Sequence, residues 1–561
     1  MIKLTKLSAN ARFTLIFLAL VSPLAITLQG WQLFHSFTLT SQGFKFLQLQ
    51  DPFWHLAIME ALAKHFPPHH PTVSGEILTN YHYLSDLFLL LISKIFHLPY
   101  WFTYYRAAPI LASFLFVLAA YFASRRLLTT RAAVVFSTLM MLFAGNAAWI
   151  IPLLAPGSRW HANSFMLDQP FDLLTNIHTY FGLALFLMII FLLGTHSKDR
   201  HRSYFLGSAL GGLLFAIKAY AGTLALGGII VVSLWSIYRK NPPSLTLSLF
   251  LPGTIIFALL YTLTTTASQA GLAFAPGWLL TKMVEDSGRF NIFPQISLRE
   301  QYYRSAGASL PLLAIGLLKL FIYLLGNFHF RLLGLLTPLY WFKRAQKPSS
   351  VEIFLITTTL ASILIPLLFN QSKSAYNIIQ FGVYALLTGS LLTAAFIEHF
   401  FASRPRLLII ILALILILSL PTSLKSFLDY TQNDHLDYVT LEEFDALNFL
   451  KRSTPTDSII LTDRDYLPLI PGLAGRTTYF SAESITRLTG IDPTIRIQAS
   501  QIFFDIATPP SSRLNFLNSA KIDYIYLNAP HHFSPLEIHD LHLEPVFQNT
   551  AVNIYQLSRY E

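Results

Sequence analysis

Long apolar stretches alternate with short polar connections over the first 421 residues of the chain. The stretches close to the roughly 20 residues that a helix needs to cross a bilayer are 13–34, 101–123, 132–154, 177–195, 204–218, 220–238, 246–267, 327–342, 351–369, 377–400 and 406–421. They predict about eleven transmembrane helices. Two further apolar stretches, 84–97 and 310–325, are shorter and each contains a lysine. We expect both to lie on the outer membrane surface or to re-enter it, and counting both as crossings gives the alternative of about thirteen helices.

Lysine and arginine residues cluster in the short connections between these stretches. Such connections face the cytoplasm in most membrane proteins. This orientation predicts a cytoplasmic N-terminus and places residues 422–561 outside. It leaves three long outer connections, at 35–100, 155–176 and 268–309, so we expect the chemistry to take place outside. A bacterial cytoplasmic membrane is the location we expect for a surface protein of this size.

The composition agrees with a multi-pass membrane protein and excludes several kinds of site. Hydrophobic residues make up 53% of the chain, charged residues make up 12%, and cysteine is absent. Disulfide bonds, thiolate metal sites and cysteine nucleophiles are therefore excluded. The net charge of +10 comes from residues 1–424, because residues 425–561 contain more acidic than basic side chains. A basic membrane part with an acidic soluble part argues against binding to nucleic acid.

The hydrophobic pattern changes after residue 424. Residues 441–450 have helical periodicity, and strand-like runs occur at 458–462, 524–527 and 552–557. We therefore divide the chain into a transmembrane module, 1–424, and a small extracytoplasmic α/β domain, 425–561. The second domain shows no recognisable catalytic constellation, and we expect it to recognise the acceptor or to cover the outer loops.

The first outer connection contains the densest set of reactive side chains. Asp51 precedes Pro52, and Asp51 and His55 are four residues apart, so they face the same way on a helix. A histidine-rich and aromatic stretch follows and ends in Asn-Tyr-His-Tyr at 80–83. Carboxylates at a membrane surface are candidate bases for a hydroxyl substrate or ligands for a divalent cation. The alternative is structural, because Asp followed by Pro is also a good helix start.

Segment 51–86, from Asp-Pro-Phe-Trp-His to Tyr-His-Tyr-Leu-Ser-Asp, resembles the GT-C glycosyltransferases. These include protein O-mannosyltransferases, aminoarabinose transferases of lipid A and oligosaccharyltransferases. The order of membrane core, three outer loops and outer domain resembles them as well. The chain has Tyr-His-Tyr-Leu at 81–84 where clearer members have His-Pro-Pro-Leu, and it lacks a Trp-Trp-Asp motif, which argues against peptide-asparagine glycosylation.

The resemblance implies roles for several acidic and aromatic residues. Asp51 matches the first-loop catalytic base, and we expect His55, four residues later, to be catalytic as well. Asp168 and Asp172 match the second-loop acids that such enzymes place near a metal, for which we expect Mg²⁺ or Mn²⁺ and, less so, Zn²⁺. The side chains that we expect to contact the substrate are those of His82, Tyr83 and Tyr220.

Basic residues on the outer side are candidates for binding the donor phosphate. Lys218 lies between two apolar spans, where an ionisable group is costly and is by default a functional candidate. The alternative for Lys218 is a lysine that reaches the membrane edge. Arg289 and Arg304 lie in the third outer loop, and arginine binds two phosphate oxygens at once. Their alternative role is ordinary solvation or contact with anionic headgroups.

Together these features predict an inverting glycosyltransferase. It would move a sugar from a polyprenyl-phosphate-linked donor to a lipid, glycan or protein acceptor at the outer face, with Asp51 as general base. One carboxylate at the reacting centre is enough for this reaction, whereas retaining hydrolysis normally uses two. Two alternatives stay open. A lipid or polysaccharide transporter or polymerase should show buried charges within its spans and often an internal repeat, and a non-catalytic envelope scaffold could share the fold.

Overall fold

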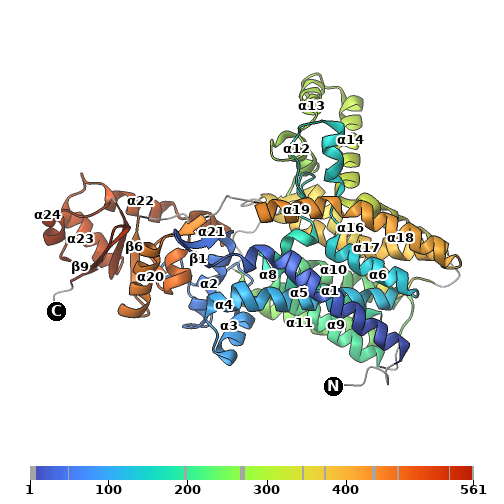
Figure 1. Ribbon diagram of the computed structural model, residues 1–561, viewed down its shortest axis with the longest axis horizontal. Helices are drawn as coiled ribbons and strands as arrows, with labels where there is room; N and C mark the ends of the chain where they lie inside the picture. Colours follow the sequence, from blue (N-terminus) through green and yellow to red (C-terminus); the bar gives the residue numbers. More distant parts are fainter. Residues whose placement is uncertain are drawn as a thin grey trace. The chain divides into compact units, whose positions relative to one another are not determined.

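The computed structural model describes residues 8–47, 50–194, 199–265, 272–343, 347–371, 375–432, 437–463, 467–529 and 531–558. The chain forms two compact units, drawn in Figure 1. The first unit comprises residues 1–31, 109–263 and 271–433, and the second comprises residues 32–108, 264–270 and 434–561. The first outer connection, 35–100, thus belongs entirely to the same unit as the C-terminal segment. The functional division of the chain at residue 424 stays a prediction.

The first unit is built mainly of apolar helices. Its longer helices are α1 (Ala9–Phe34), α5 (Ala108–Leu127), α6 (Arg131–Phe143), α8 (Ile177–Leu193), α9 (Arg200–Ile217), α10 (Ala219–Tyr238), α11 (Pro243–Thr264), α14 (Ser309–Phe328), α16 (Ser350–Leu368), α17 (Gln380–Phe401) and α18 (Pro405–Ser419). Its shorter elements are η3 (Ala147–Ile150), α7 (Ile151–Leu154), η4 (Pro170–Thr175), β3 (Leu272–Phe274), α12 (Trp278–Glu285), α13 (Gln295–Ser305), η5 (His329–Leu336), α15 (Thr337–Lys343), β4 (Phe369–Gln371), η6 (Ala375–Ile379) and α19 (Pro421–Gln432).

In their described parts, most stretches predicted to cross the membrane form a helix or a bent pair of helices. Stretch 327–342 instead covers the end of α14, the 3-10 helix η5 and most of α15. Within the described parts of the chain, 8 helices are long and apolar enough to cross, or 9 if the bent pair Arg131–Phe143 and Ala147–Leu154 is one span. Helix α8 is apolar but shorter. The number of crossings therefore stays a prediction.

The two short apolar stretches behave differently from each other. Stretch 84–97 forms α3 (Leu84–Phe96), which is too short to be a candidate span and exposes Phe88, Leu91 and Ile95. Such an exposed apolar face agrees with a helix lying at a membrane surface. Stretch 310–325 is instead the larger part of α14, which continues through η5 and α15 as one candidate span, Ser309–Lys343.

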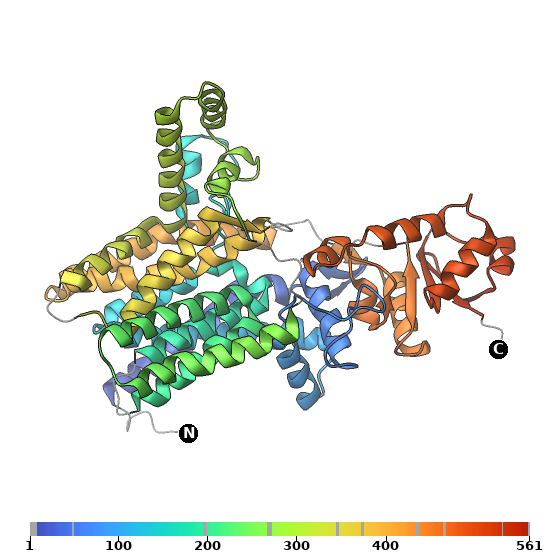
Figure 2. The same cartoon turned by 180° about the vertical axis from the view of Figure 1, so that it is seen from behind.

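Small residues allow the helices of the first unit to pack closely. A Cβ atom added to Gly212 of α9 would lie 2.4 Å from the carbonyl oxygen of Gly253 of α11, so a larger residue cannot fit there. Helix α10 packs against α9 and α16. Figure 2 shows α9, α10 and α11, drawn in green, side by side.

The second unit combines short helices with two sheets. Its helices are α2 (Gln50–Leu62), α3, α4 (Tyr100–Phe102), η2 (Thr103–Ala107), α20 (Leu441–Ser453), η7 (Ile470–Ala474), α21 (Glu483–Leu488), α22 (Thr494–Phe504), α23 (Pro510–Ser519) and α24 (Pro535–Asp540). Its strands are β1 (Thr38–Thr40), β2 (Gly43–Phe46), β5 (Asp437–Val439), β6 (Ile459–Thr462), β7 (Thr477–Thr478), β8 (Tyr524–Asn528), β9 (Leu543–Gln548) and β10 (Val552–Leu557).

The larger sheet has the strand order β7-β6-β8-β10-β9. Strand β6 pairs in parallel with β7 and β8, whereas β10 pairs antiparallel with β8 and β9. The smaller sheet has the order β1-β2-β5, and its antiparallel β2–β5 pair joins the first outer connection to the C-terminal segment. The α/β domain predicted from the sequence is thus present, and part of the first outer connection belongs to it.

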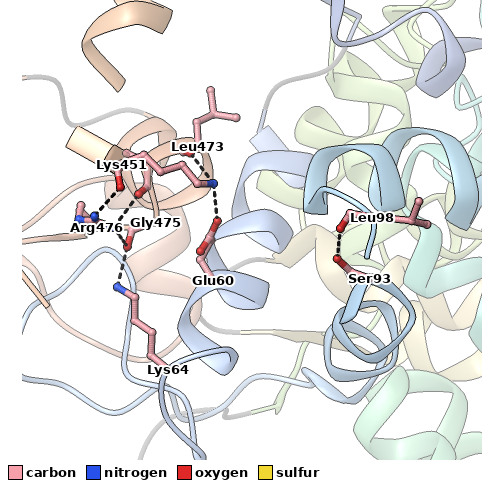
Figure 3. A network of polar contacts seen from close by, with 9 residues as sticks. Glu60, Lys64, Ser93, Leu98, Lys451, Leu473, Gly475 and Arg476 are labelled. Carbon is pink, nitrogen blue, oxygen red and sulfur yellow. Dashed lines mark hydrogen bonds and ion pairs between the residues drawn. The ribbon is translucent and has the colours of Figure 1, made fainter. Parts of the chain in front are cut away.

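Polar contacts also hold α2 against the C-terminal segment within this unit (Figure 3). Lys451 Nζ lies 3.0 Å from Glu60 Oε1, and Lys64 Nζ donates to the carbonyl oxygen of Gly475 at 2.7 Å. The buried Arg476 donates from Nη2 to the carbonyl oxygen of Lys451 at 2.9 Å. These contacts anchor the helix that carries Asp51, so the second unit places that carboxylate on a packed element rather than on a free loop.

Candidate functional site

Helix α2 carries the first group of predicted site residues. Asp51 lies in its first turn and is partly exposed, and His55 follows one turn later and is buried. His55 Nδ1 donates to Oδ1 of Asp86 over 3.0 Å, and Asp86, in the first turn of α3, is also buried. A carboxylate that accepts from one ring nitrogen holds the imidazole in one orientation. The helix start and the His–Asp pair together give a rigid setting for Asp51.

Aromatic rings surround this pair. The His55 ring stacks on Tyr104 with centroids 5.8 Å apart, and Tyr81 stacks on His82 at 4.8 Å. Asp51 and Asp86 both lie close enough to Tyr104 to interact with it electrostatically. His82 is partly exposed in the same unit.

Tyr83, by contrast, is buried at the N-cap of α3 and packs its ring against Phe66. The substrate-binding roles of His82 and Tyr83 stay predictions.

The second outer connection forms a carboxylate site in the first unit. Asp172, in η4, accepts a hydrogen bond through Oδ1 from the Tyr430 hydroxyl at 3.0 Å, and Ser426 also donates to it. Both donors lie on α19. Among the described residues, Oδ2 of Asp172 has no hydrogen-bond partner although it is buried. Burial raises the pKa of Asp172 to about 7, because these neutral hydroxyls balance only part of its charge.

Asp168 connects this site to the third outer connection. Asn163 donates a hydrogen bond to Asp168, and the carbonyl oxygen of Asn163 accepts from Arg289 Nη1 at 2.8 Å. Burial raises the pKa of Asp168, and the nearby Arg289 opposes that effect. Burial also lowers the pKa of His161, followed by the charge of Arg289. The structure therefore brings together a residue predicted to bind metal and one predicted to bind phosphate.

The two acids of the second connection suit a divalent cation. Asp168 and Asp172 interact electrostatically, and each raises the cost of charging the other. Hard cations such as Mg²⁺ and Mn²⁺ bind carboxylate oxygens, and the unpaired Oδ2 of Asp172 is such an atom. These residues offer the kind of ligand atom that the predicted metal prefers, and both the metal site and the identity of the metal stay predictions.

Lys218 and Tyr220 lie near the junction of α9 and α10. Lys218 is the residue between the two helices and only 4% of it is exposed. A Cβ atom added to Gly182 of α8 would lie 3.1 Å from Lys218 Cβ, so α8 passes close to it. Tyr220 donates from its hydroxyl to Gln371 Oε1 at 3.2 Å. The burial of Lys218 exceeds what a lysine reaching outward from the membrane edge would show.

Arg304, the other predicted phosphate-binding arginine, lies on α13 in different surroundings from Arg289. Its Nη2 atom pairs with Glu300 Oε1 at 3.1 Å, and its side chain is exposed. Glu300 Oε2 also accepts from the buried Lys319 Nζ at 2.6 Å. Helices α12, α13 and α14 pack together around this network. A role for Arg304 in phosphate binding stays a prediction.

Arg331 is a buried residue that the sequence reasoning did not single out. Only 1% of it is exposed, although it lies within the candidate span Ser309–Lys343. Its guanidinium donates to Ser390 Oγ, Gln169 Oε1 and the carbonyl oxygens of Met140, Ala144 and Gly145. It therefore holds the second outer connection, through Gln169, against the C-terminal end of α6, where a positive charge is favourable.

Arg331 could have been noticed in the sequence, because it is an arginine inside a predicted membrane span. A buried charge within a span is also what the transporter alternative expects. Because all five hydrogen bonds of Arg331 go to protein groups, they account for it as a structural residue.

No protein-family model matches this chain, and none of the curated protein sequences matches it. Solved structures do match. The oligosaccharyltransferase AglB from Archaeoglobus fulgidus, in complex with an inhibitory peptide and a dolichol-phosphate, aligns with a TM-score of 0.53 and 13% identity over 92% of this chain and 70% of that chain. An oligosaccharyltransferase from the same organism, in complex with Zn and sulfate, aligns with a TM-score of 0.53 and 14% identity, over 91% of this chain and 68% of that one.

The arabinofuranosyltransferase AftD from Mycobacteria also matches. It aligns with a TM-score of 0.52 and 14% identity, over 97% of this chain but only 42% of AftD. At such low identity these likenesses establish the fold. The chain has the fold of the GT-C glycosyltransferases, as the resemblance of segment 51–86 implied.

Proposed function

We propose that this chain is a membrane glycosyltransferase that moves a sugar from a polyprenyl-phosphate-linked donor to a lipid, glycan or protein acceptor. The reaction takes place at the outer face of a bacterial cytoplasmic membrane, with the N-terminus inside. The observation that carries the proposal is Asp51, a partly exposed carboxylate at the start of a packed helix, one turn before the His55–Asp86 pair. The fold supports the class, and the dolichol-phosphate in the AglB structure supports a lipid-linked donor.

In the proposed reaction Asp51 takes the proton of an acceptor hydroxyl. The freed oxygen attacks the anomeric carbon from the face opposite the phosphate, and the bond between that carbon and the phosphate oxygen breaks. The new glycosidic bond therefore has the inverted configuration. The phosphate leaves with the bonding electrons. Lys218, Arg289 and Arg304 are the proposed groups that stabilise its charge, and Arg289 has the additional support of its place beside the Asp168 region.

His55, His82, Tyr83 and Tyr220 have supporting roles in this proposal. His55, oriented by Asp86, holds the surroundings of Asp51, and the other three contact substrate. Asp168 and Asp172 would hold a divalent cation, Mg²⁺ or Mn²⁺ rather than Zn²⁺, which would supply positive charge next to the leaving phosphate. The unpaired oxygen of Asp172 supports that assignment.

A transfer assay with polyprenyl-phosphate sugars tests the role of Asp51. We expect Asp51→Asn and Asp51→Ala to lower kcat by about 10²- to 10⁴-fold, because each removes the proton acceptor. Asp445→Asn is the matched control, since Asp445 is an exposed aspartate on α20 of the same unit, and it should leave kcat unchanged. Transfer at the wild-type rate by both Asp51 variants would contradict the proposal.

A further inference from the structure

The larger sheet of the second unit has a topological switch point between β6 and β8. Strand β6 pairs with β7 on one side and with β8 on the other, all in parallel. After β6 the chain continues to β7, at one edge of the sheet. After β8 it continues to β9 and β10, which lie toward the other edge. In open α/β sheets, ligands bind in the crevice outside the carboxyl ends of strands that diverge in this way.

A cavity of about 580 Å³ lies at this position. Its lining includes Thr462, the last residue of β6, and Asp463 directly after it, as well as Leu527 of β8 and His531 shortly after that strand. Small-molecule sites usually have volumes of roughly 300–1,000 Å³. The topology of the sheet and the position of the cavity therefore point independently to one place.

Helix α22 contributes an amphipathic wall to this cavity. Ile497, Gln501 and Phe504 all line it, and their spacing places them on one face of the helix. Phe533, which follows β8, adds a second ring to the lining. Gln498 of the same helix is exposed and lies outside the lining. The cavity thus offers apolar ring faces beside amide and carboxylate groups.

The charges in the lining do not suit an anionic ligand. The lining contains three acidic side chains, Asp463, Asp505 and Glu537, and three basic ones, Arg513, His531 and His532. Arg513 is already paired with Glu537 through Nη1 and Oε1 at 2.9 Å, and His531 Nδ1 lies 2.7 Å from Asp463 Oδ2. Only 3% of Arg513 is exposed, and its Nε atom has no hydrogen-bond partner within the described part of the chain. Its guanidinium lies over the rings of Phe503 and Phe533, so Arg513 is enclosed by protein groups and does not offer a free charge to an anion. A phosphate in this cavity would be repelled by the carboxylates more than it would be attracted by the basic side chains, of which Arg513 and His531 are already paired.

We propose that this cavity is a carbohydrate-binding site of the C-terminal α/β domain, which takes an uncharged sugar ring. Sugar hydroxyls donate to Asp463 and Asp505 and exchange hydrogen bonds with the Gln501 amide, while a C–H face packs on the partly exposed Phe504. Hydrogen bonds within the protein fix the orientation of the Asp463 carboxylate. Its Oδ1 accepts from Asn528 Nδ2 at 2.9 Å and its Oδ2 from His531 Nδ1 at 2.7 Å, so little ordering is needed when a ligand binds.

Saturation-transfer NMR on the full chain in detergent tests this site. The probes are glucose, galactose, mannose, N-acetylglucosamine and arabinose, with inorganic phosphate as competitor. We expect at least one sugar to receive saturation from the wild-type protein and its affinity to fall by about tenfold or more in Gln501→Ala and Asp505→Asn. Gln498→Ala, the same change on the same helix outside the lining, should leave binding unchanged. Thermal unfolding of each variant verifies that it is folded.

The same measurement on Asp51→Asn separates this site from the proposed transfer reaction. We expect Asp51→Asn to bind the sugar as the wild type does, whether or not it has lost transfer activity. The proposal is overturned if none of the sugars binds, if Gln501→Ala and Asp505→Asn bind as tightly as the wild type, or if phosphate displaces the sugar. Loss of binding in folded Asp51→Asn would also overturn it, because the sugar would then belong to the reaction site.

Discussion

Buried carboxylates in the two units are compensated in different ways. In the second unit, Asp86 faces the imidazole of His55 at 3.0 Å, a partner that can carry positive charge. In the first unit, Asp172 faces the neutral hydroxyls of Tyr430 and Ser426, and burial raises its pKa to about 7. A buried charge without a charged partner is costly. The comparison indicates that Asp86, in the second unit, has a partner that can balance its charge, whereas the charge of Asp172, in the first unit, would be balanced by a cation.

Breaking the complete pair should have the largest effect on stability. We expect Asp86→Ala to lower the free energy of unfolding by about 3–5 kcal/mol, because it leaves a buried imidazole without its acceptor. Asp429→Ala is the control, since it breaks the exposed Lys425–Asp429 pair and should cost less than about 1 kcal/mol. Denaturant unfolding in detergent measures both. Equal losses in the two variants would show that burial of the His55–Asp86 pair does not matter.

Adding a divalent cation should balance the charge of Asp172 in the first unit. We expect Mn²⁺ at 100 times its Kd to stabilise the wild type by about 2.7 kcal/mol and to leave Asp172→Asn almost unaffected. The reason is that asparagine removes the charge that the cation balances. Asp445→Asn, an exposed aspartate on α20 of the other unit, should respond as the wild type does. Thermal unfolding with and without Mn²⁺ provides the measurement, and undiminished stabilisation of Asp172→Asn would rule out this carboxylate as a ligand.

A second buried histidine of the second unit, His70, differs from His55 in that its hydrogen-bond partner is a neutral hydroxyl. His70 is fully buried, and its Nε2 lies 3.0 Å from the Thr489 hydroxyl. Burial, followed by the charge of Arg496, lowers the pKa of His70 from 6.5 to about 3. The unfolded chain therefore binds a proton below pH 6.5 that the folded chain rejects, so stability is complete above pH 6.5 and falls as the pH drops toward 3.

At pH 5.5 the loss from His70 should be about 1.4 kcal/mol relative to pH 7.5. Unfolding of wild type and His70→Gln at both pH values measures it, because glutamine does not titrate and removes this part of the pH dependence. His539→Gln is the matched control, since His539 is almost fully exposed and should leave the pH dependence unchanged. A pH dependence in His70→Gln equal to that of the wild type would contradict the assignment.

Much of the fold was predictable because its elements depend on local pattern. The apolar stretches form helices, α2 begins beside Asp51 as the Asp-Pro pair indicated, and α3 is a short helix with an exposed apolar face. Length was harder to predict. The stretch 310–325 lies within α14, and the helix continues past it through Gly326 and Asn327 to Phe328.

The partners of the candidate site residues were not predictable in the same way. His55 and Asp86 are 31 residues apart, and Arg331 donates to Gln169 across 162 residues. Neither distance corresponds to a helical or strand period. The association of Asp168 with Arg289 likewise joins two different outer connections.

The sequence by itself determined the apolar helices, the shared face of Asp51 and His55, and the acidic α/β segment at the C-terminus. These follow from hydrophobicity and periodicity, which are properties of neighbouring residues. Only the tertiary structure decided which charges are paired, which carboxylate oxygen is left open, and that the first outer connection shares a unit with the C-terminal strands. Burial and pairing depend on atoms brought together from distant parts of the chain, and a linear pattern does not contain that information.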